Sequence, residues 1–262
     1  MGLKMTEKKT RLLCEDDVIK AVNKHTNDDG SLDDDISCIL EEVKDVLIAG
    51  SKEAMEELNK PIMDVIPSTF DFTESPVWFL NKFKMSFKEK EISFKHLKNI
   101  IYSICKTKFS NQKGMIQTGS YAFAKQLYED APYEIKQRML VYNGSREKNT
   151  VIQIHQMSPD TILVGPTLNE GIDLPGDDCR FIIILKVPYP SLGDKLVKEK
   201  IKLFPLWYNS TTSNEIIQGI GRGVRYDGDW CVTYILDACF WNLYLSTKDQ
   251  YSIELQNRIK MV

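Results

Sequence analysis

Two arginines near the end of the chain have the residue type and spacing that suit chemistry on phosphate groups. Arg222 and Arg225 are three residues apart, and three glycines accompany them within residues 218–225. On a helix this spacing places both guanidinium groups on one face, where they could bind polyphosphate oxygens together. Because glycine inside a helix costs about 1 kcal/mol relative to alanine, a close backbone approach or a bound ligand is the more economical explanation for the glycines.

A second polar cluster, residues 165–174, follows an apolar stretch at 161–164. In parallel α/β sheets ligands gather beyond the carboxyl ends of the strands. We therefore expect both polar clusters at that edge of the sheet.

The elements that must position these clusters alternate between strands and helices from residue 113 onward. Strands are predicted at 114–118, 138–142, 161–164, 180–185 and 231–236, and helices at 120–128, 146–157, 193–208 and 213–224. The continuously apolar run at 180–185 is typical of a strand buried on both faces. The alternation predicts an α/β fold with a parallel sheet flanked by helices.

The part that precedes this pattern divides in two. Residues 1–62 are predicted to form a small helical segment of uncertain role, and residues 63–262 are assigned to the α/β domain, with an extended, proline-containing stretch at 61–80. Residues 82–113 hold nine lysines against two glutamates, with aromatic residues between them. Such a segment can line a groove for single-stranded nucleic acid. Helical periodicity at 97–104 equally predicts a surface helix with a lysine-rich, solvated face.

Composition limits the classes of function. The 34 basic and 37 acidic residues give a net charge of −3, so any nucleic-acid surface must be a local patch. No apolar run reaches the ~20 residues that span a bilayer, and no membrane partner is expected. The six cysteines and three histidines lack metal-ligand spacing, which predicts no metal site and no iron–sulfur cluster in this chain. Scattered free cysteines indicate a reducing, intracellular location, cytoplasmic or, in a eukaryote, nuclear.

Several segments resemble the XPD/DinG-like DNA helicases of superfamily 2 and follow that family's order. Residues 218–225 (QGIGRGVR) resemble motif VI, Q-x-x-G-R-x-x-R, and residues 170–173 (EGID) resemble motif V. The resemblance covers about residues 65–245 and implies a RecA-like fold, the second motor domain of an ATP-dependent DNA helicase. The other matching segments are 66–70 (IPSTF), 113–121 (KGMIQTGSY), 166–173 (PTLNEGID), 186–194 (KVPYPSLGD) and 235–240 (ILDACF).

The resemblance also implies roles for single residues. Arg222 and Arg225 would reach the γ-phosphate of ATP, and Arg225 is the better candidate for the arginine finger. Gln218 would couple the nucleotide to the helix. Asp173 would hold the ribose or orient a motif VI arginine. The further nucleotide-binding residues are Gly171 and Glu170.

Single-stranded DNA is predicted to cross the same edge of the sheet. Hydroxyls and backbone amides at strand ends bind phosphates without reading bases. Each candidate residue is equally well explained as a helix cap or turn residue. The candidates for nucleic-acid binding are Thr118, Ser120, Tyr121 and Thr167.

The sequence holds no P-loop, G-x-x-x-x-G-K-[ST], and no D-E-A-H-like box. Phosphoryl transfer requires a phosphate cradle and Mg²⁺. We therefore expect no ATP hydrolysis by this chain alone, and ATP and Mg²⁺ shared with a P-loop-bearing motor domain in the same longer chain or in a separate subunit. The alternative is a non-catalytic module, derived from a helicase domain, that binds nucleic acid or protein. Met1 and the end at Val262, soon after the last predicted strand, indicate a complete gene product and favour the split subunit or the module.

Overall fold

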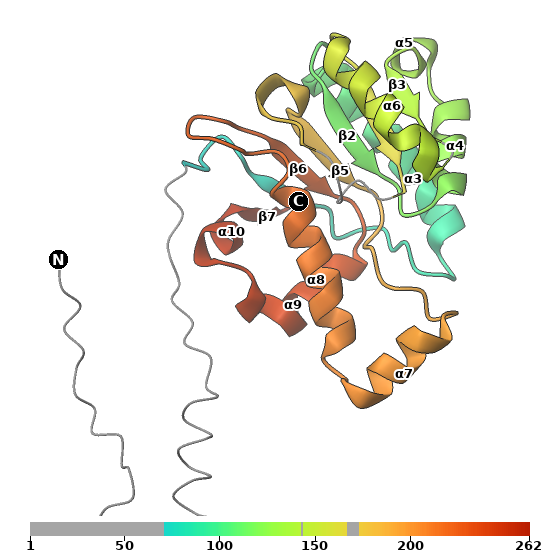
Figure 1. Cartoon of the computed structure of the whole chain (residues 1–262), viewed down its shortest axis with the longest axis vertical. Helices are drawn as coiled ribbons and strands as arrows, with labels where there is room; N and C mark the ends of the chain where they lie inside the picture. Colours follow the sequence, from blue (N-terminus) through green and yellow to red (C-terminus); the bar gives the residue numbers. More distant parts are fainter. Residues whose placement is uncertain (1–70, 143, 167–172) are drawn as a thin grey trace, which may run out of the picture. The chain divides into compact units, whose positions relative to one another are not determined.

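The computed structural model describes residues 71–142, 144–166 and 173–262 (Figure 1). The predicted helical segment at 1–62 and the domain boundary at residue 63 lie outside the described residues. Within the described ranges, no helix is long and apolar enough to cross a membrane.

A seven-stranded sheet lies at the centre of the described part, and all its neighbouring strands are parallel. The predicted parallel α/β fold is therefore confirmed. Five strands match the sequence prediction, one lies in the extended stretch at 61–80, and the last was not predicted. The strands are β1 (Val77–Phe79), β2 (Gly114–Gln117), β3 (Met139–Val141), β4 (Ile162–Gly165), β5 (Phe181–Ile184), β6 (Val232–Ile235) and β7 (Ile259–Met261), in the spatial order β3-β4-β2-β5-β6-β1-β7.

Two helical layers cover the two faces of the sheet. One core cluster joins the sheet to α6 (Ser145–Met157), α8 (Trp207–Ile220), α9 (Cys239–Thr247) and α10 (Ile253–Arg258). The other joins it to α3 (Lys90–Ser103), its π-helical extension Ile104–Lys108, α4 (Tyr121–Glu129) and α5 (Tyr133–Lys136). Consecutive residues of β5 alternate between the two clusters, as the period of a strand requires. The prediction that 180–185 is buried on both faces is confirmed.

The predicted helix at 193–208 is two elements. Helix α7 (Lys195–Leu203) ends before Pro205, and α8 begins after it. Proline has no N–H to donate and its ring clashes with the preceding turn, so a helix cannot run through it. Helix α7 has no buried residue, and it projects away from the sheet (Figure 1).

The predicted helix at 213–224 also ends earlier, at Ile220, with Gly221 as its C-cap. The prediction that Arg222 and Arg225 share one helical face is wrong, because both lie in the turn beyond α8. Val224 continues the apolar periodicity of α8 because the turn buries it in the same core cluster. The periodic pattern therefore extends past the end of the helix.

Candidate functional site

The turn between α8 and β6 carries Arg225 and brings it to Asp173. Arg225 Nε lies 3.0 Å from Asp173 Oδ1, and the two side chains are 33% and 75% exposed. The backbone N–H of Arg225 donates to Asp229 Oδ2 at 3.0 Å. The motif VI-like and motif V-like segments, 52 positions apart by these residue numbers (225 − 173), therefore meet through an ion pair.

Asp229 is the buried anchor of this turn. Its carboxylate accepts from the backbone N–H groups of Gly176, Arg225 and Trp230, at 3.3, 3.0 and 2.9 Å. It also pairs with Arg180 Nη1 at 2.8 Å, and its side chain is 0% exposed. A buried carboxylate with this many donors holds the surrounding backbone in one arrangement. Sequence reasoning missed Asp229 and Arg180; the only sequence signal was a charged residue close to the start of each apolar strand.

Close packing explains one of the three glycines. A Cβ at Gly223 would lie 2.3 Å from Cys231 Sγ, so a side chain there would clash with the residue that precedes β6. Cys231 is buried, and burial raises the pKa of its thiol well above the ordinary value. The predicted close backbone approach is therefore found at Gly223, and the neighbour is the protein's own core.

The other predicted nucleotide-binding residues differ in what the structure describes. Gln218 is exposed on the last turn of α8, and Arg222 is half-buried in the turn that follows. The predicted residues outside the described ranges are Thr167, Glu170 and Gly171.

The turn between α8 and β6 that carries Arg222 and Arg225, called the arginine turn below, lies at the amino ends of the strands. The residue before β5, Arg180, pairs with Asp229 and accepts at its carbonyl from the N–H of Val232, the first residue of β6. The prediction that this cluster lies at the carboxyl edge is wrong. The chain leaves the carboxyl end of β5 and returns along α8, so the residues after α8 emerge at the amino end of the next parallel strand.

Three of the predicted DNA-binding residues, Thr118, Ser120 and Tyr121, follow β2 and lie at its carboxyl end. Thr118 is fully buried, and its hydroxyl lies 3.1 Å from the carbonyl oxygen of Gly165 and 2.9 Å from that of Ser120. Gly119 between them has φ +75°, a conformation that side chains disfavour. Thr118 therefore shapes the loop, and its hydroxyl does not reach the surface.

Ser120 and Tyr121 begin α4. Ser120 Oγ accepts from the N–H of Phe123 at 3.2 Å, which confirms the predicted helix cap. Tyr121 is 43% exposed, and its ring packs edge-on against Tyr142, with 6.0 Å between ring centres. Of these residues Tyr121 presents the ring that an unstacked base could reach.

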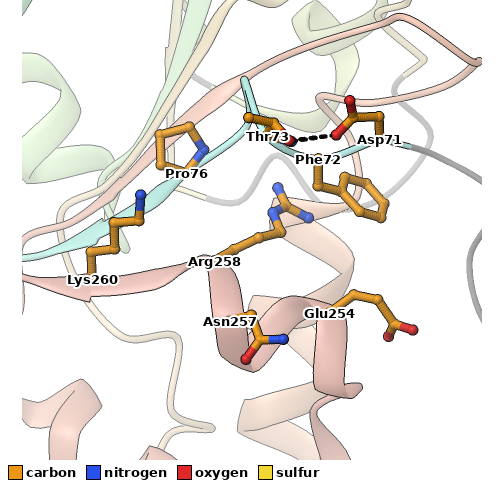
Figure 2. Close-up of a pocket in the computed structure, with 8 residues that line it drawn as sticks. All are labelled: Asp71, Phe72, Thr73, Pro76, Glu254, Asn257, Arg258 and Lys260. Carbon is orange, nitrogen blue, oxygen red and sulfur yellow. Dashed lines mark hydrogen bonds between the residues drawn. The ribbon is translucent and has the colours of Figure 1, made fainter.

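A pocket of about 350 Å³ opens near the amino ends of β1 and β7 (Figure 2). Its central guanidinium, Arg258, lies 4.5 Å from the ring centre of Phe72 and donates from Nε to the carbonyl of Ser75 at 2.7 Å. Burial lowers the pKa of Arg258 to about 10, so the group stays charged at neutral pH. A smaller neighbouring pocket shares Phe72 and Arg258 and is lined by Gly221 and Val224. Arg258 therefore ties the segment before β1 to α10 beside the arginine turn.

Residues 101–254 match the family model described as the helicase C-terminal domain. The chain belongs to this family. The resemblance to XPD/DinG-like helicases that the motifs predicted is thereby confirmed for more than half of the chain.

Curated relatives are ATP-dependent DNA helicases. The CHL1 helicase of Vanderwaltozyma polyspora is 26% identical over 139 residues, which is 45% of this chain and 16% of that protein. The chl-1 helicase of Caenorhabditis elegans is 25% identical over 119 residues, 39% of this chain and 14% of that protein. The matches thus span about a sixth of the relatives' length.

Solved structures with the same fold include XPD helicases. An XPD helicase structure has a TM-score of 0.53 at 17% identity, and the aligned part covers 72% of this chain and 35% of the chain in that structure. The structure of S. tokodaii Xpd4 has a TM-score of 0.51 at 11% identity, and the aligned part covers 84% of this chain and 53% of the Xpd4 chain. At these identities the likeness shows that this helicase C-terminal domain has the RecA-like fold of XPD.

Proposed function

We propose that this helicase C-terminal domain is the second motor half of an ATP-dependent DNA helicase and completes an ATP site with a P-loop-bearing domain. The observation that carries the proposal is the ion pair of Arg225 with Asp173, which joins the two helicase-like motifs. A domain that only bound other molecules would have no use for an arginine finger held in this way.

Arg225 is the proposed finger. Because Asp173 contacts its Nε, the two terminal amino groups of the guanidinium are the ones that would meet a γ-phosphate. The buried Asp229 fixes the backbone of Arg225, so the charge would need little reorganisation when the phosphate arrives. Arg222, Gln218, Glu170 and Gly171 would complete this side of the nucleotide.

The Mg²⁺ ligands and the phosphate cradle are assigned to the partner domain. Within the described residues, no group of three or more His, Cys, Asp and Glu side chains could hold a metal ion. The arginine turn fits the anionic part of ATP, since a guanidinium donates two parallel bonds to phosphate oxygens. ATP with its Mg²⁺ would supply the γ-phosphoryl group that is transferred to water, and ADP would be the leaving group.

The carboxyl end of β2 is the proposed start of the single-stranded DNA track. Thr118 would position its loop, and Ser120, Tyr121 and Thr167 would contact the strand. The DNA track and the arginine turn then lie at opposite ends of the same sheet. A four-residue strand is about 13 Å long, which is the separation of its two ends.

The test is Arg225→Ala in the assembled motor that contains this chain. Loss of an arginine finger lowers turnover by about 10³- to 10⁵-fold, and DNA affinity measured on the same preparation should stay near that of the unchanged protein. Arg258→Lys in the neighbouring pocket is a control that keeps a charge outside the proposed site. Unchanged ATP turnover in Arg225→Ala would refute the finger assignment.

A further inference from the structure

Residues 81–90 lead from β1 into α3 and form an exposed lysine–phenylalanine strip (Figure 1, the turquoise segment before α3). Lys82, Lys84 and Lys88 are all exposed, and Phe87 is 89% exposed. An aromatic side chain that buries so little contributes almost nothing to the core. The exposed ring of Phe87 therefore needs an explanation other than folding.

Backbone contacts hold the strip in place on both sides of its centre. The N–H of Met85 donates to the buried Asp237 Oδ1 at 2.9 Å, and the carbonyl of Phe83 accepts from the N–H of Ala238 at 2.8 Å. On the far side, the N–H of Lys90 donates to the carbonyl of Ser86 at 2.9 Å as α3 begins. Phe87 thus lies in the turn that leads into α3, directly after the part of the strip that is hydrogen-bonded to Asp237 and Ala238.

The strip is continuous with the carboxyl ends of the central strands. Asp237, which follows β6, also accepts from the N–H of Val187, which follows β5, at 2.9 Å. Beside Val187, the Lys186 side chain packs against Gly119 of the β2 loop. From the other side, Lys90 Nζ lies 5.9 Å from the ring centre of Phe123 in the first turn of α4. The strip and the loop of Ser120 and Tyr121 therefore border one surface.

The strip carries four lysines against one carboxylate, Glu89, and this net positive charge suits the backbone of a nucleic acid. Among the described residues, no carboxylate lies within ion-pair distance of Lys82, Lys84 or Lys88. The Lys82 ammonium lies 5.5 Å from the ring centre of Phe83, and the Lys90 ammonium lies 5.4 Å from that of Phe87. Alternating cations and aromatic rings bind phosphates and stack on unpaired bases. Lysine is depleted at protein–protein interfaces, so the pattern favours nucleic acid over a protein partner.

We propose that residues 81–90 extend the DNA track, with Phe87 stacking on a base and Lys82, Lys84 and Lys88 binding phosphates of single-stranded DNA. The proposal rests on the DNA-binding role proposed above for the same edge of the sheet. It adds an aromatic ring for base stacking and a row of lysines for phosphate binding, both outside the helicase motifs.

The test measures binding of fluorescein-labelled oligothymidylate to the full chain by anisotropy. Phe87→Ala should lower the affinity about fivefold or more, because the variant can no longer stack on a base. Phe204→Ala is the matched control, since this ring is 62% exposed just after α7. In a second pair, the fluorescence of Phe87→Trp should be quenched by the oligonucleotide and that of Phe204→Trp should not.

The lysines are tested by salt dependence. Replacing Lys82, Lys84 and Lys88 with glutamine should flatten the plot of log affinity against log salt, by about 0.7 for each phosphate that the variant no longer binds. The control replaces the same number of exposed lysines on α7, Lys195, Lys198 and Lys202, and should leave the slope unchanged.

The outcomes separate this proposal from the proposed function. If Tyr121→Ala weakens binding and Phe87→Ala does not, the strip proposal is overturned while the track at β2 stands. If the unchanged chain and its assembled motor bind no oligothymidylate, both proposals fail. Weaker binding by both Phe87→Ala and Phe204→Ala would show a nonspecific loss and would also overturn the strip.

Discussion

The two ends of the parallel strands differ in how they hold their basic side chains. At the amino ends, Arg180, Asp229, Arg225 and Asp173 are joined into ion pairs, and Asp229 is completely buried. At the carboxyl ends, the strip at 81–90 presents its lysines to solvent, and the polar groups of the β2 loop, such as Thr118, point inward. Fixed charges suit a chemical step that needs exact geometry, and exposed charges suit a strand that must slide. The comparison therefore supports a division into a nucleotide side and a DNA side.

The strongest way to break the amino-end arrangement is Asp229→Ala. It would leave the buried Arg180 without its buried partner, and breaking a buried ion pair costs about 3–5 kcal/mol. Urea denaturation of the full chain measures this loss. The side chain of Asp177, the other carboxylate that pairs with Arg180, is 98% exposed. Asp177→Ala should therefore lower the free energy of unfolding by at most about 1 kcal/mol. Equal losses in the two variants would show that burial of Asp229 does not matter.

At the carboxyl end, Tyr121→Ala should weaken binding of oligothymidylate. Loss of one base–aromatic stack predicts an affinity lower by about fivefold or more. Tyr133→Ala is the control, because this 73% exposed ring lies in α5, at the amino end of β3. If both variants bind equally weakly, the DNA side is not confined to the carboxyl ends.

Asp173→Asn tests whether the ion pair between the two helicase-like motifs matters for activity. Loss of the charge opposite Arg225 should lower ATP turnover of the assembled motor by about fivefold, equivalent to roughly 1 kcal/mol of exposed pairing. The urea midpoint should hardly move, since Asp173 is mostly exposed. Full turnover in Asp173→Asn would mean that the ion pair does not orient Arg225.

The smallest expected effect is on pH dependence at the amino ends. His155 is fully buried, with Nδ1 at 2.9 Å from Thr161 Oγ1 and Nε2 at 2.8 Å from the carbonyl of Asp178. Burial lowers the pKa of His155, so the folded state holds it neutral while the unfolded state takes up a proton below about pH 6.5. The contribution of His155 to the free energy of unfolding should be constant above that pH and should fall as the pH drops below it.

Thermal denaturation between pH 7.5 and pH 5 measures this contribution. His155→Gln should reduce the loss of stability on acidification, and His96→Gln, at an exposed position of α3, should not. An unchanged pH dependence in His155→Gln would assign the effect to other groups.

Much of the fold could be predicted from the sequence because the strands are short apolar runs separated by helical patterns. The run at 180–185 became β5, and Ser120 caps α4 as predicted. The strand β7 was missed because its three residues include an exposed lysine and form too short a run to stand out. Pairing with β1 determines that strand, and no local pattern records it.

The candidate site was predictable only in part. The order of the motifs predicts which residues take part, and the structure joins two of them, Arg225 and Asp173. Which end of the strands each residue reaches depends on how the chain returns along α8, and periodicity carries no such information. Thr118 looked available for phosphate because a hydroxyl is polar, but its loop turns it toward Gly165. Arg180 and Asp229 are 49 residues apart in the sequence. They meet only because β5 and β6 are neighbours in the sheet.

The most direct test of the central claim is the ATPase activity of the tagged chain alone and of the complex captured with it from its native source. We predict no ATP hydrolysis by the chain alone, and hydrolysis stimulated by single-stranded DNA once a P-loop-bearing domain is present. Turnover of ATP by the purified chain alone would contradict the account. So would a native assembly in which this sequence, in its full-length form, has neither a P-loop domain of its own nor a partner that carries one.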